Sequence, residues 1–271
     1  MKSVNSLSNW VDKIKTTVAP RQEEPVSRGR VVDVGWLIVA DKATFVYDGP
    51  RPAGRKQTLP DNVKAVGYCP AVVDHEARLF EVLCPFDLHL RVGSDKDGKP
   101  TLINVAGKKS TVARSALQSL VHLMAQDRWR DPKRPVVQIN APWRFIADEP
   151  VWMTQMPPFN HSREPAWPGL QIGGRFPIHL WPRAMMWAFE WWNPSLDLVL
   201  KRGEPWFYVR FEAQDPSRPV RMVEAEMTPE LAEFCKGLDS ITNYANQTFS
   251  LFSVAEQRRP KTLLKKKQRA Q

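Results

Sequence analysis

Short apolar segments separated by prolines, glycines and charged turns dominate the middle of the chain. The segment FDLHLRVG at 86–93 alternates apolar and polar residues, a period of two that is typical of a strand with one buried face. Similar runs rich in β-branched and aromatic residues recur at the close spacing of all-β domains. The pattern predicts strands within 31–40, 42–48, 77–85, 86–93, 101–106, 136–140, 143–147, 150–156, 175–182, 184–194 and 196–213.

Three segments have helical periodicity instead. Residues 3–18 carry an apolar stripe at helical spacing, formed by Leu7, Trp10, Val11, Ile14 and Val18. Residues 112–126 contain no turn signal and carry a second such stripe. A third helix is predicted from Thr228, a suitable N-cap, through Pro229 in the first turn to an end between 245 and 258.

These elements predict a mainly β fold, either a sandwich or jelly roll or a distorted barrel, with a helix near each terminus. We expect an N-terminal helix and linker over 1–30, a β-rich domain over 31–227, a helix over 228–257 and a basic tail over 258–271. Eight of the 11 tryptophans lie between Trp143 and Trp206, which predicts a core built from large rings.

The formal net charge of +10 is concentrated at the two ends of the chain. Residues 31–257 contain equal numbers of acidic and basic residues, whereas no acid follows Glu256. The tail could bind a nucleic-acid backbone, bind an acidic partner, or only keep the chain in solution. Its cations are Arg258, Arg259, Lys261, Lys265, Lys266, Lys267 and Arg269.

The three cysteines are few, odd in number and far apart, which favours a reduced compartment. No apolar run has the length of a signal peptide core or a membrane-spanning helix. We therefore expect a cytoplasmic protein, or one assembled into a virion if phages encode it.

One candidate for catalytic chemistry is a pair of histidines with a carboxylate. Asp87 and His89 lie two residues apart on one predicted strand, so they share a face, and His179 lies on another strand. On a cupin-like or β-clip-like scaffold such a trio would hold iron or manganese. The competing interpretation is polar residues on the solvent side of a half-buried sheet, and we expect no cofactor. The chain has no nucleophile elbow, Walker motif or dinucleotide fingerprint.

A second candidate is an aromatic interaction surface. In AMMWAFEWW at 184–192, alternation places Met185, Trp187, Phe189 and Trp191 on one face and Met186 and Trp192 on the other. The first face is predicted to be core. The second, with Trp206, is either buried by another layer or open to a protein partner.

Residues 66–212 resemble an uncharacterised domain family of bacteria and their phages. The likeness rests on ARLFEVLCPFDLHLRV, PWRF, FPIHLWP, WAFEWWNP and LVLKRGEPWFYVRF, and the matching positions include Glu81, Pro85, Gly203, Glu204 and Pro205. The closing KRGEP turn and aromatic strand are also similar to the end of dUTPase-like β-clip proteins, whose catalytic motifs are not evident here. The resemblance implies no activity.

The sequence therefore favours a non-enzymatic binding or structural protein that engages a protein partner or assembles with itself. A phage-related assembly component is the specific form we expect. A metal-dependent enzyme using Asp87, His89 and His179, and a nucleic-acid-associated factor acting through the tail, are the alternatives.

Overall fold

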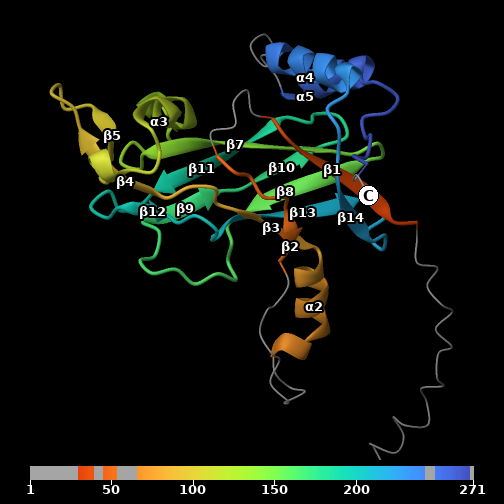
Figure 1. Ribbon diagram of the computed structural model, residues 1–271, viewed down its shortest axis with the longest axis horizontal. Coiled ribbons are helices and arrows are strands. Elements are labelled where there is room, and N and C mark those ends of the chain that lie inside the picture. Colours follow the sequence, from red (N-terminus) through yellow and green to blue (C-terminus); the bar gives the residue numbers. More distant parts are fainter. Residues whose placement is uncertain (1–29, 40–44, 54–65, 242–247, 269–271) are drawn as a thin grey trace, which may run out of the picture.

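The computed structural model describes residues 30–39, 45–53, 66–241 and 248–268. Within these ranges the chain forms three β-sheets and four α-helices (Figure 1). The prediction of a mainly β fold is confirmed, and its form is sandwich-like with several sheets rather than a closed barrel. The helix and linker predicted within 1–30 lie outside the described residues, apart from Arg30.

The largest sheet has six strands, in the order β14–β1–β7–β11–β9 with β6 beside β7. β1 and β14 run parallel, with Val34 opposite Met222, and the other neighbours are antiparallel. β14 is therefore an edge strand. The strand bounds are β1 Val32–Ile38, β6 Val121–Leu123, β7 Val136–Ile146, β9 Gly169–Ile172, β11 Ala184–Trp191 and β14 Val220–Glu224.

Two smaller antiparallel sheets complete the β structure. A five-stranded sheet has the order β10–β8–β13–β3–β2, and a three-stranded sheet has the order β12–β4–β5. Their strands are β2 Arg51–Pro52, β3 Leu79–Leu83, β4 Leu88–Ser94, β5 Pro100–Asn104, β8 Val151–Met156, β10 Gly174–Pro177, β12 Leu198–Leu200 and β13 Pro205–Ala213.

Aromatic rings fill the main core, as predicted. Trp143 and Trp187 of the six-stranded sheet lie 6.3 and 5.8 Å, between ring centroids, from Trp206 of the five-stranded sheet. All three are fully buried, and such ring pairs add about 0.5–1.5 kcal/mol each beyond their buried area. The predicted alternation of β11 is confirmed, because Met185, Trp187, Phe189 and Trp191 are all buried.

Two helices near the C-terminus, α4 Pro229–Ile241 and α5 Thr248–Arg258, cover the outer face of the six-stranded sheet (Figure 1). Leu231, Phe234 and Leu238 of α4 pack there against Leu37 of β1 and Ile146 of β7. The cap prediction is confirmed, since the Leu231 amide donates to the Thr228 hydroxyl at 3.1 Å. We call this side of the six-stranded sheet, which contains Leu37 and Ile146, the helix-covered face.

The helix predictions need three corrections. The single helix expected over 228–257 is two helices, because α4 ends at Ile241 and α5 begins at Thr248. The helix expected over 112–126 is the shorter α3 Arg114–Leu120, which leads directly into β6, where pairing with β7 overrides the helical pattern. The short helix α2 Pro70–Ala77 was not predicted, and its residues carry no buried stripe.

The strand predictions need further corrections. The runs 136–140 and 143–147 form one strand, β7, in which the pairing with β11 shifts register near Pro142. β14 was missed. Residues 45–48 form no strand, and His179 lies in a turn after β10 Gly174–Pro177.

Candidate functional site

The structure does not bring together the trio predicted to bind a metal. The Asp87 carboxylate accepts a hydrogen bond from the Arg202 amide at 3.0 Å. The His179 Nδ1 lies 3.2 Å from the amide nitrogen and 3.0 Å from the carbonyl oxygen of Val151, on β8. No group of three metal-binding side chains occurs anywhere in the described ranges. The alternative of a metal site at these residues therefore finds no support in the structure: Asp87 precedes β4, which carries His89, and His179 lies in the turn after β10.

His89 takes part in an ion network instead. Its Nε2 lies 2.7 Å from an Asp197 oxygen, and Arg91 donates two hydrogen bonds to the same carboxylate at 2.7 and 2.8 Å. The Arg91 hydrogen bonds hold the pKa of Asp197 at about 2. A carboxyl group with that pKa stays ionised near neutral pH and is a weak base, which does not suit acid–base catalysis. The network instead links β4 to the segment before β12.

The three residues proposed as an aromatic surface are not equivalent in the structure. Trp206 is fully buried in the core, so its assignment to an exposed surface is wrong. Trp192 is 53% exposed, and its indole N–H donates to the Glu190 carboxylate at 2.8 Å. Met186 is half-buried and lines a separate pocket.

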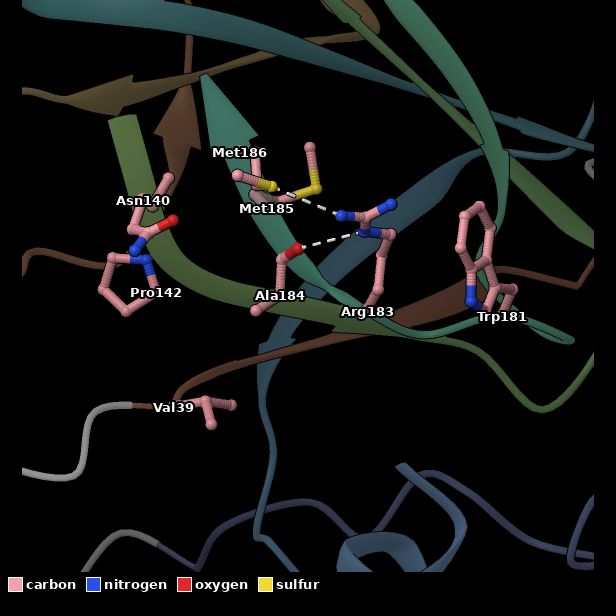
Figure 2. Close-up of a pocket in the computed structure, with 9 residues that line it drawn as sticks. Val39, Asn140, Pro142, Trp181, Arg183, Ala184, Met185 and Met186 are labelled. Carbon is pink, nitrogen blue, oxygen red and sulfur yellow. Dashed lines mark hydrogen bonds between the residues drawn. The ribbon is translucent and has the colours of Figure 1, made fainter. Parts of the chain in front are cut away.

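Figure 2 shows that pocket, on the outer face of the six-stranded sheet between β7, β11 and the segment 181–183. Its volume is about 360 Å³. Arg183 reaches across it, donating to the Ala184 carbonyl and the Met186 sulfur, both at 3.4 Å, and its guanidinium lies 4.9 Å from the Trp181 ring. No carboxylate, histidine, cysteine or hydroxyl lines the pocket among the described residues. It offers no group for proton transfer or nucleophilic attack.

The residues on which the sequence resemblance rests have structural roles in the described chain. Gly203 has φ +82° and closes the turn after β12, donating its amide to the Cys84 carbonyl at 2.8 Å. The Glu204 carboxylate lies 3.5 Å from the Arg163 Nε and 3.7 Å from the His161 Nε2. Glu81 accepts a hydrogen bond from Arg51, and Pro85 is buried. These contacts hold the loop 157–168 and β2 in place.

The basic segment near the C-terminus is docked rather than free in the described residues. Lys265, Lys266 and Lys267 form ion pairs of 2.6–2.7 Å with Glu226, Asp33 and Glu224 respectively. Arg259 donates to the carbonyls of His179 and Asp148, both at 2.6 Å. Leu263 is buried against the helix-covered face. Arg258 and Lys261 are exposed, and Arg269 lies outside the described residues.

The docked segment also extends the six-stranded sheet. The Glu226 amide donates to the Lys265 carbonyl at 2.8 Å, and the Lys267 amide donates to the Glu224 carbonyl at 2.9 Å. Ala225 and Lys266 form an antiparallel bridge. The chain thus adds an extended segment beside the end of β14, and most of the lysine charge meets carboxylates of the same protein.

An open groove of about 850 Å³ runs along β14, where the six-stranded and five-stranded sheets separate. One wall is β14 with Trp36 of β1, and the other includes Pro52 of β2, Phe80 of β3 and Ala77 of α2. Gly49 belongs to the same lining, and a Cβ there would lie 2.5 Å from the Trp36 ring. A glycine is therefore needed for the Trp36 ring to hold its place. We call this feature the β14 groove.

Charged residues also line the β14 groove, namely Arg221, Glu224, Lys266 and Lys267. Asp33 accepts a 2.7 Å hydrogen bond from Arg221 and a 2.6 Å contact from Lys266, and these cations, Arg221 first, lower its pKa. Lys267 pairs with Glu224 next to them. Sequence reasoning missed the groove because it missed β14. The alternation in VRMVE, with Val220, Met222 and Glu224 on one face, is the signal that was available.

In comparisons with known proteins, no family model, no curated protein and no solved structure matches the chain. No helix in the described part of the chain is long and apolar enough to cross a membrane.

Proposed function

We propose that this chain is a non-enzymatic binding or structural protein that engages a protein partner through the β14 groove. The observation that carries the proposal is the groove itself, an open space of about 850 Å³ with apolar walls, beside a sheet edge that no described segment pairs at Val220 and Met222. Apolar surface left open next to an unpaired strand edge is typical of sites where proteins meet.

The lining of the β14 groove favours binding over catalysis. Trp36, Phe80 and Met222 provide contact area, and Arg221, Lys266 and Lys267 provide charge at the rim. Among the described residues that line the groove, none is a histidine, cysteine or serine. The arrangement of an apolar centre with a charged rim is that of a protein interface. Assembly with a phage-related structure stays a prediction from sequence.

Site-specific photo-cross-linking tests the proposal. A benzophenone amino acid replaces Pro52, which is exposed on one wall of the groove, and in a matched control it replaces Leu170, which is exposed on β9 at the opposite edge of the six-stranded sheet. In its native cells, we expect one discrete protein to be labelled from position 52 and not from position 170. That protein, purified, should bind with a dissociation constant in the micromolar range or tighter.

Equal labelling from both positions, or no labelled protein that binds after purification, would contradict the proposal. Each variant should unfold at the same urea concentration as the natural chain, because both positions are exposed.

A further inference from the structure

The outer edge of β14 carries main-chain groups that no described strand uses. The Ala225 amide donates to the Trp36 carbonyl, toward β1, at 2.9 Å, whereas the Glu224 carbonyl points the other way, toward Lys267. Alternate residues of a strand direct their N–H and C=O groups to opposite edges. Val220 and Met222 therefore present theirs on the same free edge as Glu224.

The chain itself demonstrates that this edge accepts an extended segment. The residues 265–267 pair with it, antiparallel, next to 224–226. Among the described residues, this pairing is recorded as far as Lys267 and Glu224, and none is recorded at Val220 and Met222. A strand added there would continue a ladder that is already started.

The two faces of an added strand would meet different surroundings. Met222 packs toward the main core with Phe80 and Trp36, so alternate side chains of the added strand would enter the β14 groove. The remaining side chains would lie on the opposite face, beside Arg221 and Lys266. These two cations share the single carboxylate Asp33, which leaves one positive charge without an acidic partner in this network.

We propose that the occupant of the β14 groove is an extended segment of a partner protein, with alternating apolar and acidic side chains, which adds as a strand to the edge formed by Val220 and Met222. The main-chain hydrogen bonds and the alternating pockets are those of strand addition to an open sheet edge. This inference rests on the proposed function and specifies the form of the partner.

Selection from a displayed library of random twelve-residue peptides, against the intact purified chain, provides the probe. We expect enrichment of peptides in which apolar residues alternate with Asp or Glu. The best peptide is then synthesised in a series with one N-methyl group at each successive position. Methylation removes an N–H donor, so we expect a loss of affinity of more than tenfold at every second position and little change between them.

Two charge reversals test where the peptide binds. Arg221→Glu should weaken the binding of an acidic peptide about tenfold and reverse the sign of its salt dependence, because the excess positive charge beside Asp33 becomes an excess negative charge. The matched control is Arg175→Glu, which reverses an exposed, ion-paired arginine of similar exposure on the five-stranded sheet. It should leave the affinity unchanged.

The outcomes separate this inference from the proposed function. Peptides that lose affinity with Arg221→Glu but show no period of two on N-methylation would overturn strand addition and leave groove binding intact. Failure to enrich any alternating apolar and acidic peptide against the intact chain would also overturn strand addition by a partner. Both proposals would be contradicted if Arg221→Glu left peptide affinity unchanged and no partner protein were cross-linked from position 52.

Discussion

The helix-covered face and the β14 groove lie on opposite sides of the same pair of strands. On the first, Leu37 of β1 is buried under α4, together with Ala225 just beyond β14. On the second, Trp36 and Met222, from the same two strands, line an open groove. Neighbouring residues of one sheet are thus sealed by the chain on one face and left accessible on the other.

The difference between the two sides follows the placement of the C-terminal residues of the chain. The helices α4 and α5 and the residues 259–267 are all placed over the helix-covered face or along the last residues of the β14 edge. None of the described segments closes the β14 groove. We take the sealed face to serve stability and the open one to serve binding, and each prediction below tests that division.

The largest expected effect is on the sealed face. Leu231→Ala should lower the free energy of unfolding by about 2–5 kcal/mol, because Leu231 is 1% exposed and its truncation leaves a cavity. Met222→Ala on the groove should cost about 1 kcal/mol, since Met222 is half-buried and its neighbours can adjust. Urea unfolding of both variants measures the difference. Equal losses of unfolding free energy in the two variants would contradict the division into a sealed and an open side.

The next effect separates two arginines that look alike in sequence. Arg259→Ala should destabilise the chain by about 1–3 kcal/mol, because the carbonyls of His179, Ala147 and Asp148 would lose their shared donor. The matched control, Arg258→Ala, removes an exposed cation at the end of α5 and should cost less than about 1 kcal/mol. Indistinguishable urea midpoints would show that the docked segment does not hold the helix-covered face in place.

Sequence pattern predicted those parts of the fold that depend on neighbours in the chain. The period of two in β11 identified its four buried apolar residues, and Thr228 marked the start of α4, because both signals are local. β14 was missed because its partner β1 lies almost the whole domain away in the sequence, and so short a run depends on such distant pairing. The three lysines looked free because their carboxylate partners Asp33, Glu224 and Glu226 are distant or unremarkable in sequence.

The candidate site was predictable to a smaller extent. Asp87, His89 and His179 are suitable ligands by type, but a metal site requires convergence, and each of them has a different partner. The β14 groove arises where two sheets separate, and no single segment encodes it. The prediction of a partner-binding protein came from the absence of catalytic motifs. The proposal that the partner binds in the β14 groove required the three-dimensional arrangement.

The smallest expected effects are two pH dependences of stability, one through His179 and one through Asp33. Burial lowers the pKa of His179, whose carbonyl is held by Arg259, so the folded chain favours the neutral ring. The unfolded chain takes up a proton at higher pH, and the free energy of unfolding should therefore fall as the pH is lowered through about 6.5 toward the folded pKa. His179→Gln, which keeps a polar side chain, should flatten that part of the curve of urea midpoint against pH. The pKa of Asp33 on β1 is also lowered, chiefly by its hydrogen bond with Arg221, so Asp33→Asn should remove a separate loss of stability that begins below about pH 4. If His179→Gln retains the full slope between pH 7 and 5, the sealed side does not respond to acid through this histidine.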